Sequence, residues 1–191
     1  MDCHLGGRTG YVYPLTGVFS HFRHDPANPE SLCSDTVRTL LVDQQGYLWV
    51  GTTGGLDRYD FRTKQFKHYQ ADVHKPGAIS CNRIRKIYQD KSGTLWVATG
   101  SVWVNEGGDT DEGGLNRYDP SRDQFVTYKH DPEDGNTLIS NKVQGIFEDS
   151  RGIFWVGTSG DGLHTMDRKT GRFTRHSYDK HNPQKLSRAP L

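Results

Sequence analysis

The sequence has few cysteines and no long apolar run. Its 191 residues include three cysteines, Cys3, Cys33 and Cys81, at unequal positions along the chain. We interpret this odd set as incidental loop or strand residues, and we expect no metal site, redox site or cofactor. No apolar stretch approaches the roughly 20 residues of a membrane span, and the first residues lack the apolar core of a signal peptide. No targeting signal therefore assigns a compartment.

Charge of one sign is also lacking, because 24 basic and 23 acidic residues are interleaved and leave a net charge of +1. Such a surface has no broad field to attract nucleic acid or a membrane, and we expect neither partner; membrane contact would come only through segments outside this chain. Hydrophobic content is 32% and mean hydropathy −0.80. However, 22 glycines, 9 tyrosines, 8 phenylalanines and 4 tryptophans suit short strands joined by tight turns.

One ten-residue sequence occurs three times, at 43–52, 90–99 and 149–158. Each copy has the form Asp-x-x-Gly followed after one residue by an apolar residue, tryptophan and valine. Repeats of this length are typical of radial or stacked folds, whose units bury their faces only against one another. We therefore assign a structural role to the residues that recur in the same phase, which are Trp49, Trp96, Trp155, Asp43, Asp90, Asp149, Gly46, Gly93 and Gly152.

Each copy is flanked by strand-like segments. Residues 37–42, 84–89 and 143–148 are rich in β-branched and aromatic residues, and the Asp-x-x-Gly that follows fits a type I turn. A Gly-Leu segment and an aromatic segment supply a third and a fourth strand. Four antiparallel strands with apolar residues on both faces describe a propeller blade. The sequence predicts an all-β fold, a partial β-propeller of about three and a half four-stranded antiparallel blades.

The repeat phase also predicts the boundaries of the units. We expect a half blade, its third and fourth strands, at 1–25, blades at 35–70, 82–130 and 141–178, and a linker to a missing blade at 179–191. The second blade carries an insertion at 100–112. Closed propellers usually have four to eight blades, so we expect a fragment of a longer protein whose remaining blades belong to the same chain. A homodimer that forms a seven-blade ring is the alternative, and a stable, soluble monomer would exclude it.

The combined pattern, Asp-x-x-Gly-x-Leu-Trp-Val-Gly-Thr followed by Gly-Gly-Leu-x-Arg-Tyr-Asp, resembles the two-component regulator propeller repeat. The segments 24–32 and 130–138, which begin His-Asp-Pro, are similar to the linkers between blades of that family. The resemblance implies an extracytoplasmic, periplasmic sensor region of a bacterial histidine kinase, often of hybrid type, in a phosphorelay. Many such systems respond to polysaccharide fragments, so the resemblance implies a ligand-sensing, carbohydrate-responsive fragment without catalytic residues; the full-length protein would be the kinase.

Two groups of residues are candidates for ligand binding. The insertion contains Trp103, Asn105, Glu106, Asp109 and Asp111, an aromatic plane beside polar groups that could stack on a sugar ring and bind its hydroxyls. A loop that only covers blade surface is the alternative. Its carboxylates lack the spacing of an EF-hand, so we predict no calcium site.

The second group consists of Arg38, Arg85 and Gln144, which share one phase at the start of the first strands. We expect them near the mouth of the central channel, where they would bind an oligosaccharide or another small ligand or, as we favour, simply solvate the channel. Two other functions stay open: a non-catalytic scaffold for partner proteins, and a fragment of a propeller glycoside hydrolase, since the repeated turn is loosely similar to the Asp-box.

Overall fold

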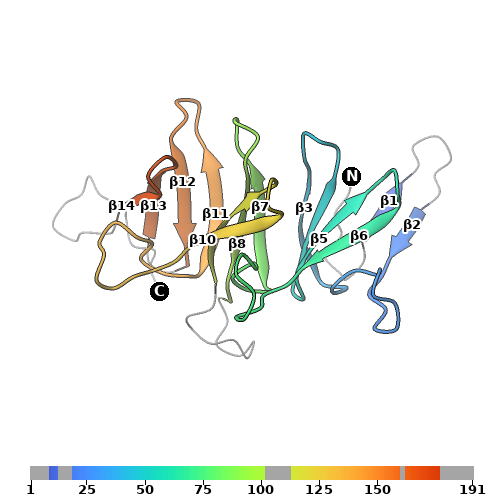
Figure 1. Cartoon of the computed structure of the whole chain (residues 1–191). Helices are drawn as coiled ribbons and strands as arrows, with labels where there is room; N and C mark the ends of the chain where they lie inside the picture. Colours follow the sequence, from blue (N-terminus) through green and yellow to red (C-terminus); the bar gives the residue numbers. More distant parts are fainter. Residues whose placement is uncertain (1–8, 13–18, 102–112, 160–161, 177–191) are drawn as a thin grey trace, which may run out of the picture.

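The computed structural model describes residues 9–12, 19–101, 113–159 and 162–176, and all regular elements in these ranges are β-strands. They form one two-stranded and three four-stranded antiparallel sheets, each a meander of consecutive strands (Figure 1). The predicted all-β partial propeller is thereby confirmed. The strands of the two-stranded sheet are β1 (Thr9–Val12) and β2 (Phe19–Phe22).

The four-stranded sheets have nearly equal strand lengths. The first contains β3 (Val37–Val42), β4 (Leu48–Thr52), β5 (Leu56–Asp60) and β6 (Gln65–Tyr69). The second contains β7 (Ile84–Gln89), β8 (Leu95–Thr99), β9 (Gly114–Asp119) and β10 (Gln124–Tyr128). The third contains β11 (Val143–Glu148), β12 (Phe154–Thr158), β13 (Gly162–Asp167) and β14 (Arg172–His176).

The repeated Asp-x-x-Gly forms the turn between the first two strands of each four-stranded sheet. The amide of Gly46 donates to the carbonyl of Asp43 at 2.9 Å, and Gly46 has a φ of +84°, a left-handed conformation that favours glycine. One carboxylate oxygen of Asp43 accepts the amides of Gln45 and Tyr47, and the other accepts the Trp49 indole Nε1–H at 2.7 Å. The aspartate therefore closes the turn and fixes the tryptophan that follows it.

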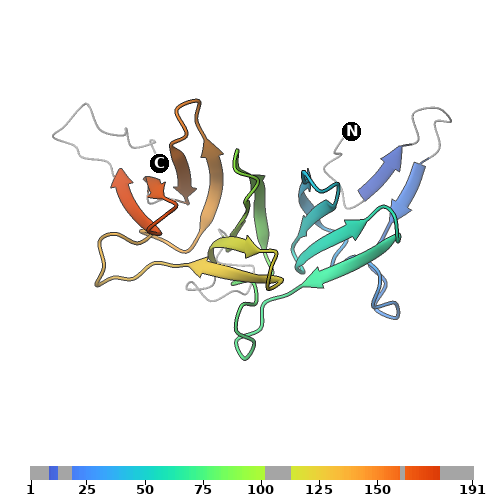
Figure 2. The ribbon, with the colours of Figure 1, turned by 45° about the horizontal axis from the view of Figure 1, so that its top comes forward.

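Adjacent sheets pack face to face along an arc (Figure 2). Trp49 and Leu56 of the first sheet share a core with Ile87, Val97 and other residues of the second sheet. Trp96 of the second sheet packs in the same way against the third, in contact with Phe154 at 4.8 Å between ring centroids. Trp49 and Trp96 are each 1% exposed. The tryptophan of one repeat thus lies between its own sheet and the next.

The tryptophan-bearing face of the third sheet is not covered by another described sheet, and its side chains are more exposed than their counterparts. Phe147 is 59% exposed, whereas Tyr88, at the same position of the second sheet, packs near Phe154 with ring centroids 6.3 Å apart. Trp155 is only partly buried and lies beside His176. Its indole Nε1 is 3.3 Å from Asp149, longer than in the other two repeats. The equal phase of the three tryptophans therefore does not give them equal burial.

Polar contacts also join the second and third sheets. Arg168 donates to the carboxylates of Asp90 at 2.7 Å and Glu148 at 2.8 Å, and Glu148 also accepts the backbone amide of Lys91. Burial would raise the pKa of Asp90, but hydrogen bonds from its own turn, from Trp96 and from Arg168 outweigh burial and hold that pKa below its ordinary value. Burial acts on Glu148 in the same way, but the Lys91 amide and the Arg168 guanidinium hold its pKa below the ordinary value as well. Both acids are therefore ionised at neutral pH, and the partly buried Arg168 links the two sheets.

Asp123 joins the first and second sheets. Its carboxylate accepts the hydroxyls of Tyr69 at 2.7 Å and Tyr118 at 2.6 Å and pairs with Lys67. Although desolvation acts in the opposite direction, these partners lower the pKa of Asp123 to about 2. The residue has a φ of +54°, which aspartate tolerates better than most residues, so the turn presents the carboxylate to the neighbouring sheet.

We predict that Trp96→Ala lowers the free energy of unfolding by about 3–5 kcal/mol, because it opens a cavity between two sheets and removes the Asp90 hydrogen bond. Trp155→Ala is the matched control and should cost clearly less, since its side chain is only partly buried in this chain. Urea unfolding of both variants checks this. Equal losses would contradict the role assigned to Trp96.

A second prediction concerns acid stability. Because the pKa of Asp123 lies below that of an ordinary aspartate in the folded chain, its contribution is present above about pH 4 and is lost as the pH falls toward 2. Asp123→Asn should lower stability at pH 7 and flatten the fall in stability between pH 4 and pH 2. Urea unfolding at several pH values measures both effects, with Glu133→Gln on an exposed linker as the control. An unchanged pH slope would refute the assignment.

Candidate functional site

A β-bulge recurs at the start of the first strand in all three four-stranded sheets. The register with the second strand shifts between residues 37 and 39, between 84 and 86, and between 143 and 145. The extra residues are Arg38, Arg85 and Gln144. Bulges re-aim a side chain and are frequent beside functional sites. Since β3 contacts β7 and β7 contacts β11, the three polar residues stand at the same level of neighbouring strands.

Two of these side chains have informative surroundings. Arg85 donates from Nε to the carbonyl of Gly100 at 2.6 Å, which is where the predicted insertion begins. Gln144 has a buried Nε2 that lacks a hydrogen-bond partner among the described residues. Buried polar groups usually have partners, so this Nε2 is an exception: a buried donor whose hydrogen bond is not made within the described part of the chain. Trp103, Asn105, Glu106, Asp109 and Asp111 lie outside the described residues.

The structure adds a groove between the first and second sheets that the sequence analysis did not predict. It has a volume of about 280 Å³ and is lined by Tyr47, Arg58, Gln89, Thr94 and Tyr118, among others. The Arg58 guanidinium lies 4.7 Å from the centroid of the Tyr47 ring and donates to the Tyr118 hydroxyl. An aromatic ring occurs at this turn position only in the first repeat, since the others have Thr94 and Ile153. Tyr47, which departs from the repeat at this position, was the sequence feature from which the groove could have been predicted.

A buried polar residue on the third strand of each sheet binds the linker that leads into the sheet. In the second sheet, Asn116 is fully buried, accepts the Ser80 amide at 3.0 Å and the Thr127 hydroxyl at 3.0 Å, and donates to the Val97 carbonyl at 3.2 Å. In the third, His164 accepts the amide of Ile139. We call this group of linker residue, third-strand residue and fourth-strand residue the linker clamp.

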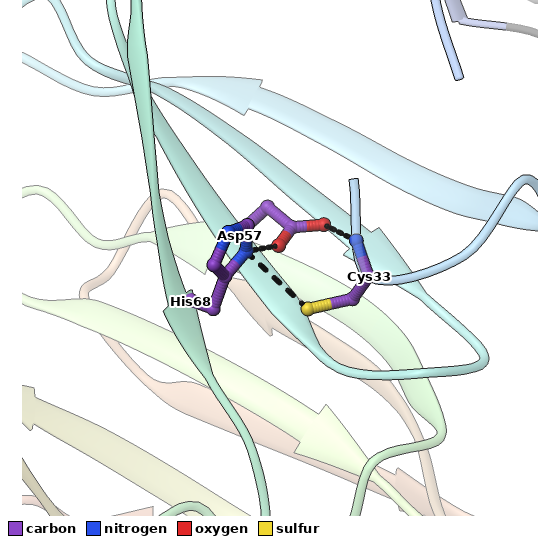
Figure 3. A group of neighbouring side chains, drawn as sticks. All are labelled: Cys33, Asp57 and His68. Carbon is purple, nitrogen blue, oxygen red and sulfur yellow. Dashed lines mark hydrogen bonds and ion pairs between the residues drawn. The ribbon is translucent and has the colours of Figure 1, made fainter. Parts of the chain in front are cut away.

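The linker clamp of the first sheet consists of Cys33, Asp57 and His68 (Figure 3). Asp57 is fully buried; its Oδ2 accepts the Cys33 amide at 3.0 Å and its Oδ1 lies 2.5 Å from His68 Nδ1. Cys33 Sγ lies 3.5 Å from the same Nδ1. The other ring nitrogen of His68 lies 2.8 Å from the Pro29 carbonyl, an acceptor only, so that nitrogen carries a proton. The sequence analysis interpreted Cys33 as an incidental loop or strand residue, whereas the structure places it in contact with Asp57 and His68.

Cys33, Asp57 and His68 do not have the geometry of a nucleophilic triad. In such a triad the acid orients one ring nitrogen while the other faces the nucleophile. Here the carboxylate and the sulfur face the same nitrogen. Burial, together with the adjacent Asp57 carboxylate, raises the pKa of the Cys33 thiol well above its ordinary value, so the reactive thiolate is disfavoured.

The stacked four-stranded meanders define the class of protein: they are consecutive blades of a β-propeller. The family model described as "Two component regulator propeller" matches residues 31–54, 78–101 and 137–160. Three segments of the chain, one at the start of each four-stranded blade, therefore match the repeat of the two-component regulator propeller family. No curated protein matches the chain.

Solved structures with similar folds include the extracellular domain of a protein assigned as a hybrid two-component system from B. thetaiotaomicron. It has a TM-score of 0.62 and 28% identity over 74% of this chain, and the match spans 18% of that protein's chain. A second such domain from the same organism has a TM-score of 0.62 and 23% identity, with 84% of this chain and 21% of that one covered. This chain thus spans about a fifth of these relatives' length.

A third similar structure, virginiamycin B lyase from Staphylococcus aureus, is an enzyme. It has a TM-score of 0.56 and 13% identity, with 90% of this chain and 48% of the lyase covered. At that identity the likeness shows the fold alone. The prediction that this chain is not an enzyme agrees instead with the matched repeats and the extracellular two-component domains.

We predict that Asn116→Ala lowers the free energy of unfolding by about 2–3 kcal/mol, because it leaves the Ser80 amide and the Val97 carbonyl without their buried partner. Asn28→Ala, in an exposed linker, should change stability by less than about 0.5 kcal/mol. Urea unfolding distinguishes the two. If both variants were equally stable, the linker clamp would have no structural role.

Proposed function

We propose that this chain is part of the extracytoplasmic, periplasmic sensor propeller of a hybrid two-component system and that it binds an oligosaccharide. The main support is the β-bulge found in all three blades, which sets Arg38, Arg85 and Gln144 at one level of neighbouring first strands. Similarity to an extracellular two-component domain supports the compartment and the sensing role. Among the described residues, no helix is long and apolar enough to cross a membrane.

Oligosaccharide is the ligand that suits these groups best. Two guanidinium groups and a primary amide supply several hydrogen-bond donors for the hydroxyl oxygens of a sugar. The Gln144 Nε2 has no hydrogen-bond partner among the described residues, so a ligand acceptor that reaches it replaces no existing hydrogen bond of that atom. The hydrogen bond from Arg85 to Gly100 connects the three bulge residues to the start of the insertion, whose aromatic and polar residues we propose as additional contacts.

A second candidate function is contact with another protein surface. It is supported by the exposed side chain of Phe147 and the partly buried Trp155 on the open face of the third blade. Their counterparts in the other blades pack against a following sheet. We propose that further blades of the same chain cover this face. Light scattering after size exclusion tests the alternative of a second copy, because a concentration-independent monomer would exclude a two-chain ring.

The sugar proposal predicts that the 191-residue chain binds oligosaccharides on a glycan array and that Arg85→Ala or Gln144→Ala lowers the affinity at least tenfold. Arg62→Ala is the matched control. It removes the same charge, but its 83% exposed side chain lies in the β5–β6 turn, at the opposite end of the sheet from Arg38. The control should bind as the wild type does.

The other outcomes are equally decisive. If no glycan on the array bound, a carbohydrate ligand for this chain would be contradicted. Binding that is lost in Tyr47→Ala but retained in Arg85→Ala would place the ligand in the groove between the first two blades. Hydrolysis of a bound glycan would instead favour the glycoside hydrolase alternative. Intact folding of each variant is checked by its urea unfolding midpoint.

A further inference from the structure

The three copies of the linker clamp differ in one chemical respect. The second blade uses Ser80, Asn116 and Thr127, which are neutral, and the third uses Ile139, His164 and Arg175. The first blade has Cys33, Asp57 and His68 at the same three positions. The second blade shows that the fold can close this clamp with neutral side chains alone, and only the first blade fills all three positions with residue types that bind transition metals.

The donor atoms of these three residues converge. Cys33 Sγ, a carboxylate oxygen of Asp57 and His68 Nδ1 all lie within 4.8 Å of one another (Figure 3). Around a tetrahedral Zn²⁺, a thiolate sulfur and an imidazole nitrogen lie about 3.5 Å apart, given bonds of about 2.3 and 2.0 Å. The observed separation of Sγ and Nδ1 is 3.5 Å.

The nitrogen and oxygen are closer than such a site requires. Nδ1 and Oδ1 are 2.5 Å apart, and zinc would need about 3.4 Å between them. The His68 side chain is 26% exposed, so a small movement of the imidazole can open this gap.

The surrounding hydrogen bonds also suit metal ligands. The Pro29 carbonyl accepts the proton of the second ring nitrogen of His68, which leaves Nδ1 free to coordinate once its proton is released. Metal-binding histidines usually have such a partner, which fixes the tautomer and the ring orientation. Asp57 keeps Oδ2 on the Cys33 amide, so its other oxygen is the one directed to the metal.

Charge balance favours a divalent ion. Without metal, one proton lies on the Cys33 sulfur and one lies between His68 Nδ1 and Asp57 Oδ1. Binding of Zn²⁺ releases both, and the resulting thiolate and carboxylate neutralise the two positive charges. The site is therefore neutral before and after binding, which avoids the cost of burying a net charge beside the fully buried Asp57.

We propose that Cys33, Asp57 and His68 bind one Zn²⁺ ion, with a water molecule at the fourth position. The ion would fasten the linker before β3 to strands β5 and β6. The partly exposed imidazole gives it access from solvent. A site with sulfur, nitrogen and oxygen ligands selects zinc or cobalt over magnesium or calcium, which prefer oxygen alone. The inference does not depend on the proposed sugar binding.

The neighbouring repeats supply variants that should fold. Cys33→Ser, Asp57→Asn and His68→Thr each copy the residue that the second blade has at that position. The control is Cys81→Ser, which copies Ser34 and Ser140 at the corresponding position of the other repeats. Cys3→Ser tests the remaining cysteine of the chain.

The test is titration of the reduced 191-residue chain with Co²⁺, a spectroscopic substitute for Zn²⁺, and with Zn²⁺ itself. We expect one Co²⁺ per chain, a thiolate-to-cobalt charge-transfer band that Zn²⁺ displaces, and a rise in the thermal unfolding midpoint on Zn²⁺ addition. Cys33→Ser should lose the band, and Asp57→Asn and His68→Thr should weaken binding more than about tenfold. Cys81→Ser and Cys3→Ser should bind as the wild type does.

Absence of the band from the wild-type chain would overturn the proposal. So would a band that persists in Cys33→Ser or disappears in Cys3→Ser, because the sulfur ligand would then be another cysteine. Urea unfolding without metal shows whether each variant is folded. A variant that folds like the wild type without metal but gains no thermal stability from Zn²⁺ supports the site and excludes a merely structural effect of the substitution.

Discussion

The structure depends on a tryptophan that is buried between consecutive sheets and held there by an aspartate of its own turn. A single four-stranded sheet of this kind has two apolar faces and no covering helix, so it is stable only against a neighbour. The indole supplies the contact area, and its Nε1–H would be unsatisfied in that interface without the carboxylate. Because the same aspartate also accepts the turn amides, one residue determines both the hairpin and the position of the wedge.

This constraint decides where variation is tolerated. The sheet faces are occupied by packing, as the fully buried Val50, Leu56 and Leu115 illustrate. Residues that can change without loss of the fold lie at strand ends, bulges and linkers. The extra residues of the three bulges are polar, and the linker clamp alternates between neutral and ionisable side chains. Functional candidates therefore concentrate at one end of the blades, where the linkers enter, while the groove beside Tyr47 depends on the turn at the other end.

The repeat made most of the fold predictable from sequence. The first strands begin and end at the predicted residues, since aspartate and glycine mark each turn and the apolar phase marks each strand. The linker clamp was not predictable, because Cys33 lies 24 residues from Asp57 and 35 from His68. Only the pairing of β5 with β6 and the return of the linker bring them together. Equal phase also failed to predict burial for Trp155, which depends on a neighbour rather than on its own repeat.

Internal repeats provide a reference that single-copy folds lack. Asn116 and Asp57 occupy equivalent positions and both accept a linker amide at 3.0 Å, so the fold requires an acceptor there and not a charge. Replacing a neutral acceptor by a buried carboxylate costs desolvation unless a cation or a proton compensates it. His68 supplies that compensation in the present structure, and Cys33 then adds a sulfur that neither the turn nor the packing needs. The departure of all three residues from their counterparts is thus better explained by a bound ion than by folding alone, because folding is already satisfied in the next blade without them.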